Sequence, residues 1–174
     1  MVGGWPEPVE RVAAFLRESG AEARLEEFAT GTPTAEAAAE AAGCALEQIV
    51  KTLVLLCDGR PVVALVPGDR RGDPAKVARA AGAARARVAR PEEVVAATGF
   101  EPGAVAPFPL PRVERVLVEP ALLSHPVVWV GAGSPRHLAM LAPAELVRLT
   151  RAEPVDVVQE PAYHSRSEPE TKER

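Results

Sequence analysis

Residues 49–66 read Ile-Val-Lys-Thr-Leu-Val-Leu-Leu-Cys-Asp-Gly-Arg-Pro-Val-Val-Ala-Leu-Val, two apolar runs joined by Asp58-Gly59. Asp-Gly between apolar segments is the strongest short-range signal for a β-hairpin, because both turn residues tolerate positive φ. Apolar residues occupy both faces of 49–57, which is typical of a strand inside a sheet. The pattern therefore predicts a central strand over 49–57 and an antiparallel partner over 61–66.

Helix signals surround this hairpin. Thr34 offers a hydroxyl N-cap to an alanine-rich segment that ends at Gly43, and residues 9–16 carry apolar side chains at helical spacing before Gly20. Helices are thus expected over 9–16, 35–42, 73–81, 91–98 and 144–149, and other strands over 23–28, 85–89, 113–118, 127–130, 137–141 and 155–158. The irregular alternation of elements predicts a single mixed α+β domain.

Length and composition narrow the function classes. At 174 residues the chain fits one domain, and 47% hydrophobic against 25% charged residues indicates an ordinary folded core. A formal net charge of −4 excludes a generally basic nucleic-acid binder, and 4% aromatic residues argue against several stacking platforms for single strands. Residues 1–8 and 161–174 are rich in glycine, proline or charge and are expected to be disordered.

Metal, cofactor and membrane signals are weak. Cys44 and Cys57 lack metal-ligand spacing and are expected to be reduced core residues. Without a zinc motif or dinucleotide fingerprint, no metal or cofactor is expected. No apolar run approaches the roughly 20 residues that span a bilayer, and residues 1–8 lack the features of a signal peptide. We expect a cytoplasmic protein with no membrane partner.

Lys51 is the outlier of the hairpin. Strand alternation places it on one face with Ile49, Leu53 and Leu55, all apolar. A lysine aimed into a pocket, toward a phosphate or carbonyl oxygen of a ligand, explains this position because a buried ammonium requires such an acceptor. A lysine whose stem lies on the sheet while its head reaches water explains it equally well.

The segment 131–135, Gly-Ala-Gly-Ser-Pro, follows an expected strand. Its glycines allow close approach of the backbone and outward-facing N–H groups that suit a carbonyl or an oxyanion. A plain hairpin connection explains the same residues. His137 lies just past this segment and is a candidate for the same site, whereas His125 and His164 are expected on the surface.

One stretch of the chain is strongly basic. Between positions 70 and 90 a single acid, Asp73, stands against Arg70, Arg71, Lys76, Arg79, Arg85, Arg87 and Arg90. Such a stretch can contact RNA phosphates. A solvated face, balanced by acidic residues elsewhere, is the alternative.

Five motifs occur in order along the chain: the Thr34-Ala35-Glu36-Ala37-Ala38 block, Gln48-Ile49-Val50-Lys51-Thr52-Leu53-Val54, Leu65-Val66-Pro67-Gly68-Asp69, Thr98-Gly99-Phe100 with Pro102-Gly103, and Gly131 to Pro135. Together these motifs resemble the YbaK family of aminoacyl-tRNA editing domains. They occur in the family's order across about 9–158, so the editing domain is expected over 9–160. The resemblance implies a curled, mixed and mostly antiparallel sheet, partly barrel-like and flanked by helices.

The resemblance also implies an activity, hydrolysis of the ester of mischarged tRNA. At this length the chain resembles the free-standing members rather than the insertion domain of prolyl-tRNA synthetase. The implied partners are the acceptor end of aminoacyl-tRNA and, beyond it, prolyl-tRNA synthetase. Lys51 matches the family's key site residue, and the substrate contacts implied are Phe28, Thr30, Thr34, Thr98, Gly99, Gly103, Gly131, Ala132, Gly133, Ser134, Pro135 and His137.

The implied substrate is cysteine or alanine on tRNA for proline, since small differences in apolar volume give a synthetase only about 1–3 kcal/mol of discrimination. In the expected mechanism the 131–135 backbone polarises the ester carbonyl and Lys51 fixes the terminal adenosine. Attack comes from water or from a group of the substrate. Ala104 and Ala106 depart from the family's usual Gly and Ser or Cys, which leaves a non-catalytic tRNA- or synthetase-binding module as the alternative.

Overall fold

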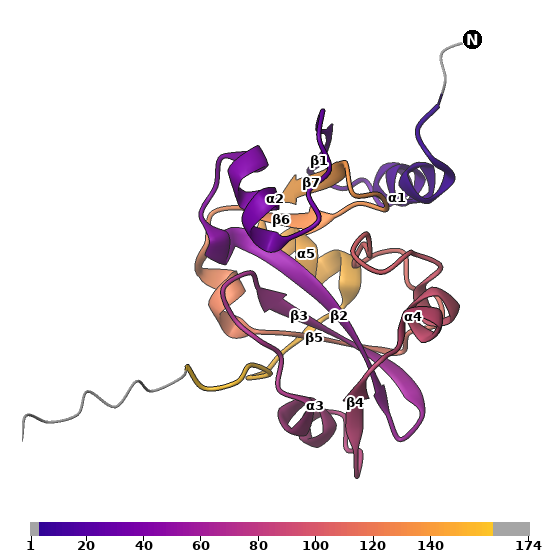
Figure 1. Ribbon diagram of the computed structural model, residues 1–174, viewed down its shortest axis with the longest axis vertical. Helices are drawn as coiled ribbons and strands as arrows, with labels where there is room; N and C mark the ends of the chain where they lie inside the picture. The colour runs from indigo at the N-terminus through magenta and orange to yellow at the C-terminus, as the bar shows by residue number, and fades with distance from the viewer. Residues whose placement is uncertain (1–3, 162–174) are drawn as a thin grey trace, which may run out of the picture.

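The protein is presented as a computed structural model, which describes residues 4–161 (Figure 1). The ends that are expected to be disordered therefore lie partly outside the described residues, at 1–3 and 162–174. The helices are α1 (Glu7–Glu18), α2 (Ala35–Ala42), α3 (Pro74–Ala80), α4 (Pro91–Thr98) and α5 (Pro143–Thr150). The strands are β1 (Ala23–Glu27), β2 (Ile49–Cys57), β3 (Arg60–Pro67), β4 (Ala86–Val88), β5 (Arg115–Val118), β6 (Val128–Gly131), β7 (His137–Leu141) and β8 (Glu153–Pro154).

The β2–β3 hairpin is the centre of the fold, as the sequence predicts. Its two turn residues, Asp58 and Gly59, have φ of 48° and 80°, the left-handed values that an Asp-Gly turn of this class requires. The register runs from Val50 opposite Pro67 to Cys57 opposite Arg60. Figure 1 shows β2 crossing the middle of the molecule, with strands on both sides of it.

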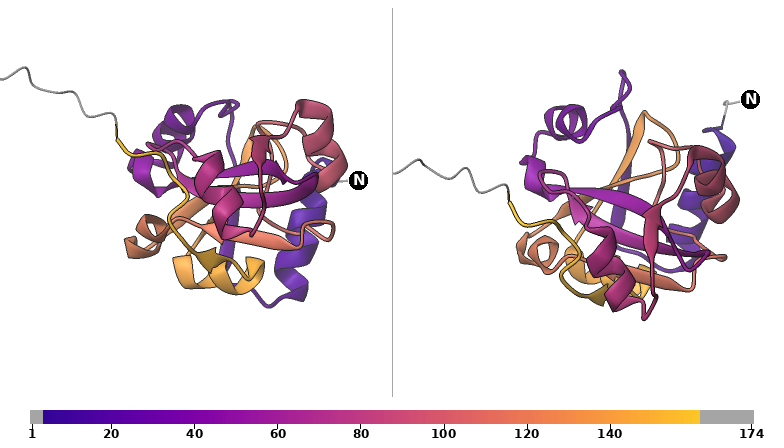
Figure 2. Two further views of the ribbon diagram at one scale, coloured as in Figure 1. Left: turned by 90° about the horizontal axis from the view of Figure 1, so that it is seen from below. Right: turned by 60° about the horizontal axis from the view of Figure 1, so that its bottom comes forward.

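The eight strands form one mixed sheet in the order β1-β7-β6-β2-β3-β5-β8, and β4 pairs with β2 off this path. Antiparallel pairs are β1–β7, β2–β3, β2–β4 and β6–β7, and parallel pairs are β2–β6, β3–β5 and β5–β8. Helices surround this sheet (Figures 1 and 2). The expected single α+β domain with a mixed sheet is confirmed.

Local signals set the helix ends. The Thr34 hydroxyl accepts the Ala37 N–H as the N-cap of α2, and Gly43 ends that helix with φ of 68°. Helix α1 begins at Glu7 rather than at Val9, because Pro8 falls in its first turn, where a missing N–H costs no hydrogen bond. Two short 3₁₀ helices, 46–48 and 120–124, are not indicated by the apolar pattern.

The expected edge strand over 155–158 is wrong. The strand lies earlier, at β8, and Val158 makes only an isolated bridge to Gly72. The apolar pattern that suggested a strand reflects burial instead, because Val157 and Val158 pack into the core beneath α3. The Val157 peptide bonds to the loop at Asp73 and to a carboxylate, and in this segment only Val155 bonds to a strand, through its N–H to the Val118 carbonyl oxygen of β5.

Candidate functional site

One edge of β2 is interrupted, and the site lies at this gap. On that edge β6 pairs with Ile49 and Val50, and β4 pairs only from Leu55 onward. The intervening residues have no strand beside them on this edge within residues 4–161. Along a strand, the peptide groups of successive residues point to opposite edges. The Ile49 carbonyl accepts from the Gly68 N–H on the β3 edge, and the Val54 carbonyl accepts from the Ala89 N–H on the other edge. The peptide groups of Thr52 therefore point to the same edge as those of Val54, into the gap.

A cavity of about 280 Å³ occupies this gap. Its wall is formed by Thr32, Pro33, Thr34, Ala35, Ala38, Ile49, Val50, Lys51, Thr52, Leu53, Gly103, Val105, Trp129, Gly131 and Leu138. Ligand pockets commonly enclose about 300–1,000 Å³, so this one suits a small group at the end of a larger substrate. Among the described residues, Lys51 is the one titratable side chain in the wall.

Lys51 is half-buried in that wall, which favours the pocket interpretation over a side chain reaching water. Its ammonium donates a hydrogen bond to the backbone carbonyl oxygen of Arg70. Burial lowers the pKa of Lys51, and the charge of Arg71 lowers it further, while Glu36 and Asp69 act in the opposite direction. A partly desolvated ammonium that retains one neutral acceptor can still bind a phosphate or carbonyl oxygen of a ligand.

Two glycine-containing loops, distant in sequence, meet at the cavity. Gly103 lies on the loop that follows α4 and has φ of 81°, and Gly131 ends β6. A Cβ on Gly131 would stand 2.6 Å from the Val105 carbonyl oxygen, so the two backbones are in contact. Ala104 and Ala106 are buried, and neither lines the cavity.

The rest of the 131–135 segment makes contacts within the fold and does not line the cavity. Ala132 is fully buried in the core, and its N–H donates to the His137 carbonyl oxygen at 3.2 Å. Gly133 has φ of 100°, and a Cβ there would stand 2.8 Å from the Pro8 carbonyl carbon and oxygen. This glycine is therefore required for the contact between the segment and the start of α1.

The end of the segment is tied to the β1–α2 connection. The Pro135 carbonyl oxygen accepts from the Thr32 N–H at 2.6 Å and from the Thr32 hydroxyl at 2.9 Å. The Arg136 guanidinium donates to the Phe28 and Ala29 carbonyl oxygens at 3.2 and 2.6 Å. These bonds fix the polypeptide around Thr32, which itself lines the cavity.

His137 is buried on the opposite face of β7 from Leu138, the β7 residue in the cavity wall. Its Nδ1 lies 2.5 Å from the Ser134 hydroxyl oxygen, and its Nε2 lies 3.8 Å from a Glu27 carboxylate oxygen without a hydrogen bond. Burial lowers the pKa of His137, which favours a neutral ring. Ser134 and His137 thus form a pair behind the cavity wall.

The cavity brings together some of the expected site residues and not others. Lys51, Thr34, Gly103 and Gly131 line it. Outside the wall lie Phe28, Thr30, Thr98, Gly99, Ala132, Gly133, Ser134, Pro135 and His137. Thr98 caps the end of α4, where its hydroxyl donates to the Val94 carbonyl oxygen and accepts from the Phe100 N–H. The Gly99 carbonyl oxygen accepts from the Arg11 side chain at 2.8 Å.

Several wall residues are not anticipated from the sequence. Trp129 shares a strand face with Gly131 two residues later, so alternation could have found it. Thr52 follows Lys51 directly, and its hydroxyl is buried without a hydrogen-bond partner among residues 4–161. Thr32 and Val105 lie on loops, and no local pattern reveals them.

A second, larger cavity of about 590 Å³ lies at the turn end of the hairpin. Charged residues of both signs line it, including Asp58, Arg60, Arg115 and Glu153, and none of the expected site residues takes part. Within residues 4–161, no three His, Cys, Asp or Glu residues are grouped so as to hold a metal ion. No helix in this part of the chain is long and apolar enough to cross a membrane.

Comparisons with known proteins agree with this architecture. The family model described as aminoacyl-tRNA editing domain matches residues 29–149. Protein YwhH of Bacillus subtilis, described as uncharacterized, is 36% identical over 121 residues, which cover 69% of this chain and 76% of YwhH. A proline–tRNA ligase of Nitratidesulfovibrio vulgaris is 34% identical over 145 residues, or 77% of this chain. The chain spans about a quarter of the length of that ligase (25%).

A solved structure described as "a putative trans-editing enzyme for prolyl tRNA synthetase" has the same fold. It superimposes with a TM-score of 0.84 at 34% sequence identity, covering 90% of this chain and all of that one (100%). The family model covers more than half of the chain and includes Lys51, Gly103 and Gly131. The resemblance seen in the five sequence motifs is thereby confirmed, and the chain belongs to the aminoacyl-tRNA editing domain family.

Proposed function

We propose that this protein is a trans-editing aminoacyl-tRNA deacylase that removes cysteine or alanine from tRNA for proline. The observation that supports this most directly is the gap beside β2, where Lys51 stands in the wall of a small cavity between two glycine-containing loops. The proline–tRNA ligases that match the chain, and the solved structure described as a trans-editing enzyme, support the choice of tRNA.

The size and lining of the cavity favour a small aminoacyl group. Most of its wall is apolar, from Ala35 and Ala38 on one side to Trp129 and Leu138 on the other. A synthetase pocket shaped for proline cannot strongly exclude smaller amino acids, because differences of this size give only about 1–3 kcal/mol of discrimination. A second pocket that admits the smaller group removes the error.

The reaction is ester hydrolysis. Water adds to the aminoacyl carbonyl carbon, the bond from that carbon to the ribose oxygen breaks, and the products are the free amino acid and a tRNA hydroxyl. Peptide N–H groups at the open edge of β2, that of Thr52 among them, are placed to polarise the ester carbonyl. Lys51 binds the phosphate or ribose of the terminal adenosine, so the ester is held in a fixed orientation.

Among residues 4–161, the wall contains no carboxylate, imidazole or thiol, and we assign the proton of the attacking water to an acceptor outside this set. A hydroxyl or amino group of the substrate, or a second water, accepts this proton. Lys51 then acts by binding and orientation rather than as a base, and the reaction requires its charged form.

The test is deacylation of tRNA for proline charged separately with alanine, cysteine, serine and proline. The expected result is rapid hydrolysis of the alanyl or cysteinyl ester, with prolyl-tRNA spared, and loss of activity in Lys51→Ala. Arg60→Ala is the matched control, since it removes one positive charge from an exposed residue of the same hairpin. Salt-sensitive tRNA binding without hydrolysis would instead identify a non-catalytic module of this fold.

A further inference from the structure

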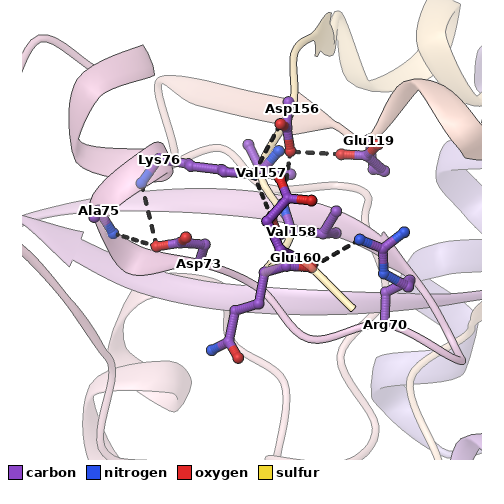
Figure 3. Close-up of polar contacts among 10 residues, drawn as sticks. Arg70, Asp73, Ala75, Lys76, Glu119, Asp156, Val157, Val158 and Glu160 are labelled. Atoms are coloured by element: carbon purple, nitrogen blue, oxygen red, sulfur yellow. Dashed lines mark hydrogen bonds and ion pairs between the residues drawn. The ribbon is translucent and has the colours of Figure 1, made fainter. Parts of the chain in front are cut away.

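Residues 155–160, the C-terminal strap, lie outside the stretch that the family model matches. The strap runs beside α3 and along the loop 70–73 (Figures 2 and 3). The Asp73 N–H donates to the Val157 carbonyl oxygen at 2.7 Å, and the Gln159 N–H donates to the Arg71 carbonyl oxygen at 2.8 Å. These two bonds form an antiparallel bridge that pairs the strap with the loop.

Side chains fasten the strap at two further points (Figure 3). The Lys76 ammonium of α3 donates to an Asp156 carboxylate oxygen at 2.8 Å, to the Val158 carbonyl oxygen at 2.7 Å and to a Glu160 carboxylate oxygen at 3.2 Å. On the other side, a carboxylate oxygen of the buried Glu119 accepts the Val157 N–H at 3.1 Å. Val157 is fully buried and Val158 nearly so, and these two side chains anchor the strap to the core.

The loop that the strap holds is the loop that contacts Lys51. The Arg70 carbonyl oxygen accepts the hydrogen bond from the Lys51 ammonium, while the Arg70 guanidinium donates to the Gln159 carbonyl oxygen at 2.7 Å. The Gln159 side chain donates to the Gly72 carbonyl oxygen at 3.2 Å. A Cβ on Gly72 would stand 2.6 Å from a methyl carbon of Leu53, so the loop lies directly on the face of β2 that carries Lys51.

We propose that the C-terminal strap is a positioning device for Lys51, because it holds the loop 70–73 so that the Arg70 carbonyl fixes the Lys51 ammonium in the cavity wall. The effect on catalysis rests on the proposed deacylase function, but the effect on Lys51 does not. The charged groups around Lys51 are Glu36 from α2 and Asp69 and Arg71 from the segment after β3, and none belongs to the strap. Release of the strap therefore acts on Lys51 through solvation and through the position of its acceptor.

The test loosens the strap in the full chain by two independent substitutions. Lys76→Met removes the three bonds from α3, and Gln159→Pro removes the N–H that Arg71 accepts. Lys76→Arg is the conservative rescue variant. Arg79→Met is the control: it removes the same charge from the same helix, beside the strap, at a side chain that makes no hydrogen bond or ion pair with residues 155–160. Amide hydrogen exchange at Asp73 reports whether the loop has been released, because that N–H bonds to the strap.

The sequence contains three lysines, Lys51, Lys76 and Lys172, so ¹³C-labelled lysine gives few enough signals for Lys51 to be followed by NMR titration. In the native protein Lys51 is expected to titrate below its ordinary pKa of about 10.4. Release of the strap is expected to expose the Lys51 ammonium to water, and since burial is the largest cause of its lowered pKa, to move that pKa toward the ordinary value. The same release is expected to lower kcat/KM for deacylation roughly tenfold, because Lys51 binds and orients the substrate. Lys76→Arg and Arg79→Met are expected to leave the Lys51 titration as it is.

Two results would overturn the proposal. One is a faster Asp73 exchange with an unchanged Lys51 titration, since the loop would then have moved without effect on the lysine. The other is an unchanged Asp73 exchange in both loosening variants, since the strap would then not hold the loop. If the native protein hydrolyses no charged tRNA, the proposed function fails, while the titration still decides whether the strap positions Lys51.

Discussion

The carbonyl oxygen of Val105 lies 2.6 Å from the point where a Cβ on Gly131 would stand. Two loops that are distant in sequence therefore meet backbone to backbone at the cavity, and only a residue without a side chain permits this approach. The shape of the cavity depends on this contact as much as on any side chain in its wall.

Gly131→Ala is accordingly expected to displace the loop that carries Gly103 and to reduce deacylation at least tenfold, because the ester would be held out of position. Overpacking at this contact should lower the free energy of unfolding by about 1–3 kcal/mol, measured by urea denaturation. Gly82→Ala is the control: Gly82 has φ of 66°, but a Cβ there meets no atom within 4 Å. That variant should lose only about 1–2 kcal/mol through backbone strain and keep its activity. An active and stable Gly131→Ala protein would contradict this account of the cavity.

Thr52→Val tests the buried hydroxyl in the cavity wall. That hydroxyl has no hydrogen-bond partner in the part of the chain that the structure describes, so a methyl group of the same shape is expected to leave the free energy of unfolding unchanged or to raise it by about 1 kcal/mol. If the hydroxyl bonds to the aminoacyl group, deacylation should fall while stability does not. Thr52→Ser keeps the hydroxyl and is the matched control for activity. A clear loss of stability in Thr52→Val would show that the hydroxyl is satisfied in solution.

Glu93 is expected to make part of the stability depend on acid pH. The Arg87 guanidinium, at 2.7 Å, and the Arg90 N–H lower the pKa of Glu93 to about 2. This folded-state pKa lies below the unfolded value of about 4.3. The ionised Glu93 therefore contributes its full stabilisation above about pH 4.3, and this stabilisation is lost as the pH falls toward about 2.

Urea unfolding at a series of pH values between 7 and 2 measures this contribution. The Glu93→Gln protein should show a smaller decrease in stability over the acid part of that range than the native protein. Glu92→Gln, one residue earlier and without an ion pair within residues 4–161, removes the same charge and should retain the native pH dependence. Equal acid dependence in all three proteins would contradict the assignment.

Much of the fold follows from local sequence patterns. The Asp58-Gly59 turn, the apolar runs around it, the Thr34 cap and the glycine stops act through bonds and dihedral angles within a few residues, so they are readable without the tertiary structure. The edge strand expected over 155–158 is wrong because alternating apolar residues show that a segment is buried, not what its peptide groups bond to. The Val157 peptide groups, for example, bond to Glu119 and to Asp73 of the loop 70–73, which are distant in sequence.

The candidate site, like the fold, is determined partly by the sequence alone and partly by the tertiary structure. The sequence alone determined that Lys51 is a charged residue on an apolar strand, and that glycines stand at 103 and 131. The tertiary structure decided that these residues share one cavity, and that Ser134 and His137 lie behind its wall. It also decided that the sheet is interrupted beside Thr52 and that Lys51 bonds to Arg70. The physical reason is the sequence separation of the interacting residues. Turns and helix caps are formed by hydrogen bonds within one short segment, whereas a cavity exists only where strand pairing and loop contacts bring distant segments together.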